Sequence, residues 1–371
     1  MLDNSQFSIS NRQLIFIILG NTVATGMISL PSIASKQAHQ DAWLVVMGGA
    51  FAPLLVLLLV ERLFRRFPGY SFTDISCLLF GKIIGKILVL SVLAYFIYFQ
   101  AVVLSTVTQV TKVFVLPQTP NRVILIVIAL AVVYVASLGA KAIANINEIY
   151  LYQFILFNIL WLIPLFLAGD YTNLLPVGES GFKGLGYGIL TTSFAYSGIE
   201  ILLLVYPMVD KSQPVLKAGF IAVVFTMAFY LLLTLSSLAV FGSNALGSII
   251  VWPGITILKV LDFPVIGRFE IFYLLLWMGF GLRPAFIMHM ASSYTLSGLW
   301  GTTTNRTYQY YLLGLGAVMV LFAFVPISTD QVFRMADFSG RMFLVIGIVY
   351  PFLYLCMAAL RSKLGSLQQY S

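Results

Sequence analysis

Repeated apolar runs of about 20 residues constrain this sequence more than any other feature. An α-helix of that length crosses roughly 30 Å of hydrocarbon and satisfies its own backbone hydrogen bonds there. We therefore predict an all-α integral membrane protein with about ten transmembrane helices. The predicted spans lie near residues 13–33, 43–63, 86–113, 122–139, 147–168, 184–208, 217–241, 269–298, 308–325 and 340–360.

The composition agrees with a membrane protein and argues against most other classes. Of 371 residues, 60% are hydrophobic and 9% are charged, whereas soluble domains carry roughly a quarter charged residues. No hydrophilic stretch is long enough for a second core, so residues 1–371 form one predicted transmembrane domain. The net charge of +8 is spread thinly between apolar runs, which speaks against nucleic acid as a partner. The sequence shows no phosphate-binding loop, metal cluster or catalytic set, so we expect neither an enzyme nor a cofactor.

Basic residues predict the orientation of the chain in the lipid bilayer. With the N-terminus inside, twelve Lys and Arg residues fall on the inner connections and eight on the outer ones. A cluster of Arg62, Arg65 and Arg66 directly follows the second span, and such clusters stay on the cytoplasmic side. Both termini are therefore predicted to be cytoplasmic.

Two connections are long enough to hold structure of their own. Residues 64–85, on the inner side, mix apolar and polar residues at helical spacing, which predicts an interfacial helix. Residues 242–268, on the outer side, are interrupted by Pro and Gly. We expect them to form a lid of short helices packed on the bundle, at a position suited to gating.

Spans one and six each carry small and polar residues near the predicted membrane midplane. Backbone groups freed by such residues are tolerated in a span only where protein or a cavity covers them. The first set is Asn21, Thr22, Thr25, Gly26 and Ser29, followed by Pro31. The second set is Ser193, Ala195, Tyr196, Ser197 and Gly198, followed by Pro207. Either set alone is more often a helix-packing surface than a helix break.

The two sets occupy matching positions in the two halves of the chain. Spans one and six are the first of each half, and an odd number of spans makes them cross in opposite directions. We therefore predict an inverted 5+5 repeat, with repeat one at about 13–168 and repeat two at about 184–360. Paired broken helices of such repeats form ligand sites, and a half-helix end exposes amides that suit a carboxylate.

Two charged residues are predicted to lie inside the membrane. Glu200 follows the break in span six, and Arg283 lies in the middle of span eight, directly before Pro284. Each is costly in lipid without a partner, so both are expected to face the bundle interior or water. They would act on a ligand, a proton or a gate, or would form a buried structural pair, and the sequence leaves both possibilities open. Tyr95 and Tyr98 form an aromatic patch with Gln100 in span three, for which core packing competes with a role in the cavity.

At this point the residues resemble a known family, the endospore germination permeases. These are the B subunits of nutrient germinant receptors, within the amino acid–polyamine–organocation superfamily. The resemblance covers nearly the whole chain. It rests on NTVATGMISLPS at 21–32, FAYSGIEILLLVYP at 194–207 and VWPGITILKVLDFPVIGRFEIFYLLLWM at 251–278.

The resemblance implies a fold similar to that of the bacterial leucine transporter, with helices one and six broken. It implies a small-molecule germinant, often an amino acid, and a complex with an A subunit and a lipoprotein C subunit in the spore inner membrane. An active amino-acid permease or symporter is the alternative function. Carried onto this chain, the candidate binding residues are Asn21, Thr25, Gly26, Tyr95, Tyr98, Ala195, Tyr196, Ser197, Gly198, Arg283 and Pro284. Two features depart from the family pattern: Arg283 carries charge, and span five lacks the lysine that replaces a sodium ion in some superfamily members.

Overall fold

The computed structural model describes residues 7–210, 214–261, 269–300 and 304–363. In these ranges the chain is helical, apart from short connections and one isolated β-bridge. Six described stretches are long and apolar enough to cross a membrane, and two shorter apolar helices accompany them. The six are Leu30–Arg66, Lys82–Phe114, Ala140–Ala168, Val215–Ser248, Glu270–Gly298 and Thr329–Ser362, and the two are Asn121–Ser137 and Ile199–Met208. An all-helical membrane protein is thus confirmed.

The helices cover the predicted spans, but some ends differ clearly: α8 begins at Ala140 instead of near 147, and the stretch that contains span ten begins at Thr329 instead of near 340. The first half contains α1 Asn11–Thr22, η2 Thr25–Ile28, α2 Leu30–Ala38, η3 His39–Asp41, α3 Ala42–Gly49, α4 Phe51–Arg66, α5 Phe72–Phe80, α6 Lys82–Phe114, α7 Asn121–Ser137, α8 Ala140–Asn158, η4 Ile159–Trp161, α9 Leu162–Ala168 and η5 Tyr171–Leu174. The second half contains α10 Gly181–Thr191, α11 Ser193–Tyr196, η6 Ile199–Ile201, α12 Leu202–Val205, η7 Tyr206–Met208, α13 Val215–Ser248, α14 Pro253–Thr256, η8 Ile257–Val260, α15 Phe269–Gly281, α16 Arg283–Gly298, α17 Asn305–Ala323, α18 Thr329–Leu344, η9 Val345–Val349 and α19 Tyr350–Lys363.

Local sequence explains where several helices begin. Ser10 caps α1, because its hydroxyl accepts from the amide of Gln13 while the Gln13 side chain accepts from the Ser10 amide. Such reciprocal bonds satisfy two of the amides that a helix start leaves free. Ser71 and Asp74 make the same arrangement at α5. The predicted helix in residues 64–85 is therefore present as α5, which packs against α6 and α19.

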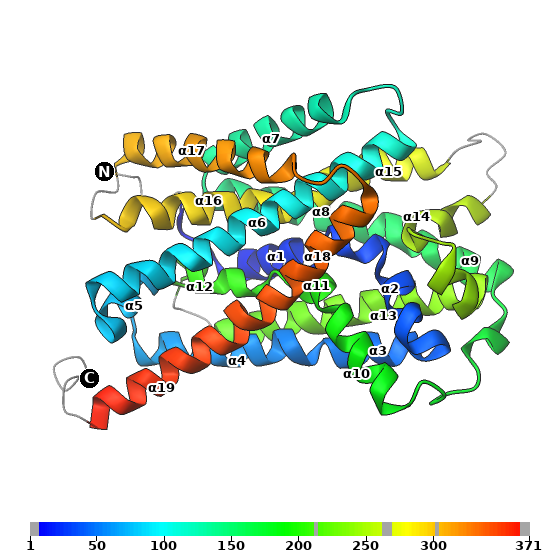
Figure 1. Ribbon diagram of the computed structural model, residues 1–371, viewed down its shortest axis with the longest axis horizontal. Helices are drawn as coiled ribbons and strands as arrows, with labels where there is room; N and C mark the ends of the chain where they lie inside the picture. Colours follow the sequence, from blue (N-terminus) through cyan, green and yellow to red (C-terminus); the bar gives the residue numbers. More distant parts are fainter. Residues whose placement is uncertain (1–6, 211–213, 262–268, 301–303, 364–371) are drawn as a thin grey trace.

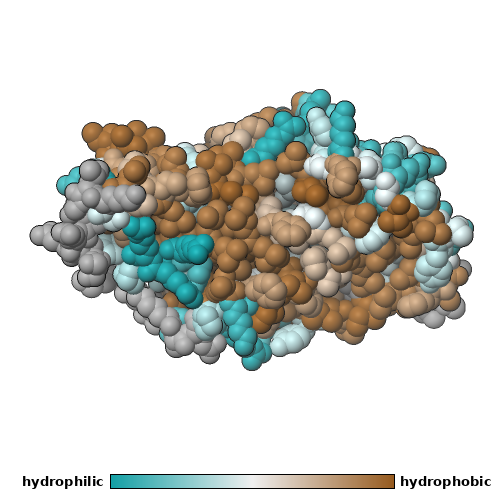
Figure 2. Space-filling view, turned by 90° about the horizontal axis from the view of Figure 1, so that it is seen from below, coloured by the Kyte–Doolittle hydropathy of each residue, from teal (hydrophilic) through white to brown (hydrophobic). Residues whose placement is uncertain are grey.

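The long helices run roughly along the longest axis of the molecule, and α18 and α19 cross them obliquely (Figure 1). One continuous core of buried apolar side chains extends through nearly all of them. Large apolar side chains also cover the outside, and Figure 2 shows a broad hydrophobic surface with hydrophilic residues gathered mainly toward the two ends. Among the exposed apolar side chains, those of Phe51, Ile83 and Leu167 are each at least 75% exposed. In water such a surface would drive aggregation, whereas in a bilayer it faces lipid.

Residues 242–268 were predicted to form a lid. Gly242, with φ 73° and ψ 158°, interrupts α13 at the predicted end of the span, and a short helical segment follows as far as Ser248. Short helices α14 and η8 follow, and residues 262–268 lie outside the described part of the chain. Helix α14 packs closely on η2 and α2. A Cβ on Gly254 would lie 3.0 Å from the Cα of Ile28. The segment thus covers the region where span one is interrupted.

The first and last described residues lie at the same end of the molecule (Figure 1). Arg66 at the end of α4 donates hydrogen bonds to the carbonyl of Ala358 and the hydroxyl of Ser362, both in α19. Phe7 and Ser71 line one cavity at this end. The predicted arginine cluster therefore lies beside both ends of the described chain, as a shared cytoplasmic side requires. Lys211, which the orientation also used, lies outside the described residues.

Candidate functional site

Span one is interrupted between α1 and α2. Helix α1 ends at Thr22, and the next two residues leave the helical region, with φ/ψ of −87°/93° at Val23 and −146°/−121° at Ala24. The chain then turns through η2, and α2 begins at Leu30 with Pro31 in its first turn. Proline fits there because the first amides of a helix have no intrahelical partner. Thr25 and Gly26 begin η2, so their amides also lack a partner inside that helix.

Span six is interrupted at Ser197 and Gly198. Ser197 is extended, with φ −70° and ψ 158°, and Gly198 has a φ of 122°, in the region that favours glycine. Helix α11 ends just before these residues, and η6 and α12 continue the span after them. The sequence prediction of interruptions at both positions therefore agrees with the helix ends seen here.

The two interruptions are in direct contact. The side-chain amide of Asn21 donates to the carbonyl oxygen of Gly198. A Cβ on Gly198 would lie 2.5 Å from the Asn21 carbonyl oxygen, and a Cβ on Gly26 would lie 2.9 Å from the Cα of Ala195. Glycine is thus required on both sides of this crossing, because any side chain would push the two backbones apart.

Tyr230, from the middle of α13, joins the two interruptions. Its hydroxyl lies 2.9 Å from the carbonyl oxygen of Thr22 and 2.7 Å from that of Ala195, and it donates to both. These carbonyls belong to the last turn of α1 and to α11, where the helices leave acceptors free. The sequence analysis missed this residue, because one tyrosine in a long apolar run looks like ordinary core. A hydroxyl that needs a partner in the middle of a span was the available signal.

Glu200 stabilises the start of the second half of span six. Its carboxylate accepts from the amide of Gly198 at 2.7 Å and from the hydroxyl of Tyr95 at 2.6 Å. The side chain is fully buried. Its negative charge lies in the first turn of the helical segment that begins at Ile199, where the helix dipole is positive. Tyr95 therefore belongs to this site through Glu200.

Arg283 stabilises the end of the first half of span one. Its Nη2 donates to the carbonyl oxygen of Val23 at 2.8 Å, and its Nε donates to that of Phe280 at 3.0 Å. The guanidinium carbon lies 3.5 Å from the centre of the Phe280 ring. Arg283 is 1% exposed, and Pro284 beside it is buried in the first turn of α16.

The structure does not pair Glu200 with Arg283. Each charge is satisfied separately, at a different interruption, and within the described ranges no ion pair joins them. The sequence left open whether the two side chains form a pair. In the structure each of them contacts a helix end instead. Each helix end offers a partial charge of the opposite sign without the need for a second ionised side chain.

The remaining predicted residues surround this crossing to different extents. Thr25 is buried, and its methyl group would lie 3.5 Å from a Cβ on Gly281. Ser197 donates to the carbonyl of Phe194. Tyr196 points away, since its hydroxyl donates to the Val46 carbonyl in α3. The other tyrosine of the span-three patch, Tyr98, also contacts another region: it donates to the Met335 carbonyl and packs on Phe322 and Phe338.

Cavities lie at both ends of the molecule, on either side of the crossing. One, of about 240 Å³, is lined by residues of α2, α10, the end of α13 and α18, including Ser32, Lys36 and Asp337. The other, of about 590 Å³, is lined by the first described residues, α5, the end of span six and α16. Neither of these two cavities is lined by a residue of the two interruptions.

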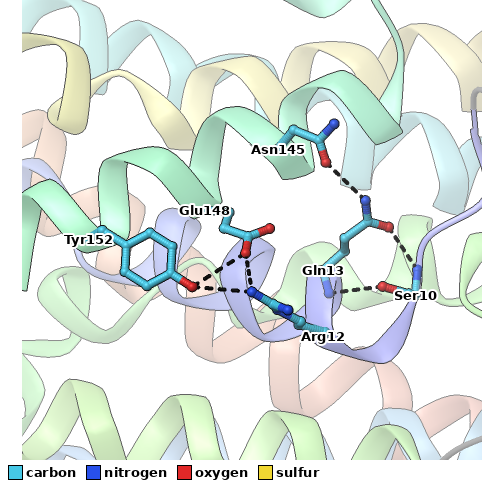
Figure 3. Close-up of polar contacts among 6 residues, drawn as sticks. All are labelled: Ser10, Arg12, Gln13, Asn145, Glu148 and Tyr152. Atoms are coloured by element: carbon cyan, nitrogen blue, oxygen red, sulfur yellow. Dashed lines mark hydrogen bonds and ion pairs between the residues drawn. The ribbon is translucent and has the colours of Figure 1, made fainter.

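The start of α1 is attached to α8 by exposed polar contacts (Figure 3). The guanidinium of Arg12 forms an ion pair with the carboxylate of Glu148 and lies 3.2 Å from the hydroxyl of Tyr152. The next residue of α1, Gln13, donates to the side chain of Asn145, which lies one turn before Glu148 in α8. The first half of span one is thus held at its N-terminal end by surface contacts and at its C-terminal end by Arg283.

Comparison with known proteins identifies the family. The family model described as "Spore germination protein" matches residues 8–332 of this chain. The chain belongs to this family. The sequence resemblance to germination permeases is thereby confirmed.

Relatives in Bacillus match over nearly the full length. Spore germination protein YndE of Bacillus subtilis is 23% identical, with 96% of this chain and 97% of the relative covered. Spore germination protein GerQB of Bacillus cereus is 25% identical, with 94% of each covered. Spore germination protein B2 of Bacillus subtilis is 23% identical, with 97% of this chain and 98% of the relative covered.

A solved structure supports the fold independently. The crystal structure of MhsT in complex with L-phenylalanine aligns with a TM-score of 0.61 at 12% identity, covering 94% of this chain and 97% of that chain. At this identity the likeness concerns the fold alone. This member of the family is therefore a multi-pass membrane protein with a transporter-like fold, similar to that of MhsT.

Proposed function

We propose that this chain is the germinant-binding B subunit of a spore nutrient receptor. A small molecule, with an amino acid as the first expectation, would bind where spans one and six are interrupted. The direct contact between the two interruptions supports this most strongly, because it brings backbone groups from both halves together at one point. Membership of the spore germination protein family supports the role in germination.

The proposed architecture has ten membrane crossings in two inverted repeats. Repeat one would run from about 13 to 168 and repeat two from about 184 to 360, with both termini cytoplasmic in the spore inner membrane. The presence of an interruption in the first span of each half supports the repeat.

The chemistry of the crossing suits a zwitterion. The amides of Thr25 and Gly26 lie at a helix start, where a carboxylate is favoured. Backbone carbonyls at the end of α11 offer acceptors for an ammonium group. Gly26 and Phe194 keep some accessible surface although their neighbours are buried. An A subunit and a lipoprotein C subunit are the proposed partners, and they would carry the response onward.

A graded series at Gly26 tests the site. Gly26→Ala and then Gly26→Val should weaken germinant binding progressively, because a Cβ already lies 2.9 Å from the backbone of Ala195. Binding of labelled amino acids to the purified chain and germination of spores carrying the variant are the measurements. The control is Gly186→Ala in α10, where a Cβ meets nothing within 4 Å. Normal binding and germination by Gly26→Val at normal protein level would rule out this site.

An active permease or symporter is the second candidate, because the fold is that of a transporter. Uptake of labelled amino acids into proteoliposomes that contain only this chain separates the two functions. Saturable uptake favours the permease. Binding without uptake favours a sensor that reports occupancy to its partners.

A further inference from the structure

An apolar groove runs between α4 and the start of α13. Its volume is about 470 Å³, and its apolar walls are Leu54, Leu57 and Leu58 of α4 with Leu216 and Phe220 of α13. Residues three and four positions apart lie on one face of a helix. Each helix therefore contributes one continuous face to the groove.

The two helices touch along the floor of this groove. A Cβ on Gly219 would lie 2.4 Å from Cδ1 of Leu57, so glycine allows the helices to approach closely here. Leu57 is buried, whereas Leu58 and Phe220 are exposed. The groove thus has a buried floor and exposed rims, and it opens outward from the bundle toward lipid.

Two basic side chains, Arg65 and Lys217, line the same groove. Arg65 lies in the last turn of α4 and Lys217 in the first turn of α13. The rise along α4 from Leu54 to Arg65 is about 16 Å. Helix α4 runs along the lower edge of Figure 1, and Figure 2, seen from that side, shows a hydrophobic middle with a hydrophilic patch toward the end at which α4 stops. The groove is therefore apolar along its length and positive at one end.

The two cations keep most of their hydrogen-bonding capacity. Arg65 donates through Nε to the carboxylate of Glu61 at 2.7 Å, which fixes the direction of the guanidinium. Within the described ranges Arg65 makes no other hydrogen bond, and Lys217 is exposed and makes no hydrogen bond or ion pair. One carboxylate thus stands against two positive charges, and the Nη nitrogens and Nζ remain as donors.

We propose that this groove binds one anionic phospholipid. An acyl chain would lie along the leucines, and the phosphate would contact Arg65 and Lys217 at the membrane surface. Arg and Lys are the side chains that bind phosphate, and basic groups at a membrane surface attract anionic headgroups. An apolar helix of another protein would fill the groove but would leave both cations without a partner. The inference does not rest on the proposed function, because it concerns the chain in its bilayer.

Native mass spectrometry of the purified full chain in detergent tests this proposal. The probes are dioleoylphosphatidylglycerol, which is anionic, and dioleoylphosphatidylcholine, which has the same chains and no net charge. One phosphatidylglycerol should bind about 25-fold more tightly, since each Lys or Arg near a membrane surface contributes roughly a factor of five. Equal affinities for the two lipids would show that only bulk lipid covers this face and would overturn the proposal.

Variants at the basic end separate this site from the overall charge. Lys217→Gln should weaken phosphatidylglycerol binding about fivefold and leave phosphatidylcholine binding unchanged. Arg65→Gln combined with Lys217→Gln should abolish the preference, and if this double variant does not fold, Lys217→Gln alone decides. The control is Arg62→Gln, because Arg62 is exposed on the same helix and does not line the groove. Equal losses in Arg62→Gln and Lys217→Gln would contradict a defined headgroup site.

A matched pair of tryptophan variants tests the apolar part. Leu55 and Leu58 are both exposed on α4, but only Leu58 lines the groove. Leu58→Trp should weaken binding of both lipids several-fold, because the indole takes the space of the acyl chain, and Leu55→Trp should not. Equal binding by the two variants would place the lipid outside the groove. A dimer in place of bound lipid, lost in Leu58→Trp, would identify a second copy of the chain as the occupant and would also overturn the proposal.

Discussion

The interruptions in spans one and six differ in the origin of the groups that stabilise them. In span six the stabilising carboxylate, Glu200, lies two residues after Gly198 on the same span, although Tyr95, Asn21 and Tyr230 add contacts from other helices. In span one the charged group at the end of α1 is Arg283, which comes from the distant helix α16. The charge that stabilises the interruption is therefore local in span six and distant in span one. A helix end held from outside can be released by moving its neighbours, which makes α1 the better candidate for the moving part.

Gly198→Ala should have the largest effect on stability, because it adds a Cβ at the interruption of span six itself. The residue has a φ of 122°, and its Cβ would lie 2.5 Å from the Asn21 carbonyl oxygen. Backbone strain and overpacking together predict a loss of about 3 to 6 kcal/mol in the free energy of unfolding. Thermal unfolding measures it, with Gly186→Ala as the control. A loss no larger than that of the control would show that residue 198 can adopt this backbone conformation, and this contact with Asn21, without being glycine.

Glu200→Ala should have the next largest effect. It leaves the amide of Gly198 and the hydroxyl of Tyr95 buried without their acceptor, which predicts a loss of roughly 2 to 4 kcal/mol. Glu200→Gln keeps an acceptor oxygen, so its decrease in Tm should be at most half of the decrease caused by Glu200→Ala. Equal losses for the two variants would mean that the negative charge, and not the hydrogen bonds, stabilises the helix start.

Tyr230→Phe should have a smaller effect on stability but should act on both interruptions. The hydroxyl donates to carbonyls on either side of the crossing, and its removal predicts a loss of about 1 to 2 kcal/mol. If the crossing is the ligand site, the germinant concentration for half-maximal response should also change. Tyr187→Phe, at an exposed position in α10, is the control. A changed Tm with an unchanged response would separate the structural bridge from ligand binding.

The local nature of the span-six interruption explains why sequence reasoning predicted it well. The order Ser197, Gly198, Glu200 carries both the turn and its stabilising charge within four positions. The partners of span one could not be predicted in the same way. The sequence left open whether Arg283 pairs with Glu200, and the structure shows that each charge contacts a different helix end. Which carbonyl a long side chain reaches depends on helix rotation and packing, and apolar periodicity does not encode either.

The span pattern was predictable for a related reason. Hydrocarbon thickness imposes a length on every crossing, so the apolar runs identify the helices even where propensity is weak. Ends without such a constraint were placed less well. Helix α18 begins at Thr329, well before the predicted start of span ten near 340, because Ser328 caps it outside the apolar run. Tyr230 was missed because a single polar group in a span differs little from core residues until its neighbours are known.

Breaking the Arg12–Glu148 ion pair should have the smallest effect on stability and the most specific effect on motion. The Arg12 side chain is 68% exposed, so the pair contributes less than about 1 kcal/mol. Arg12→Glu should leave the Tm nearly unchanged and should raise the reactivity of a cysteine placed at Phe7 toward an aqueous thiol reagent. The double exchange Arg12→Glu with Glu148→Arg should return that reactivity toward the original value. Unchanged reactivity in the single variant would mean that Arg283 and Tyr230 alone hold α1 in place, and the proposed moving part would then lie elsewhere.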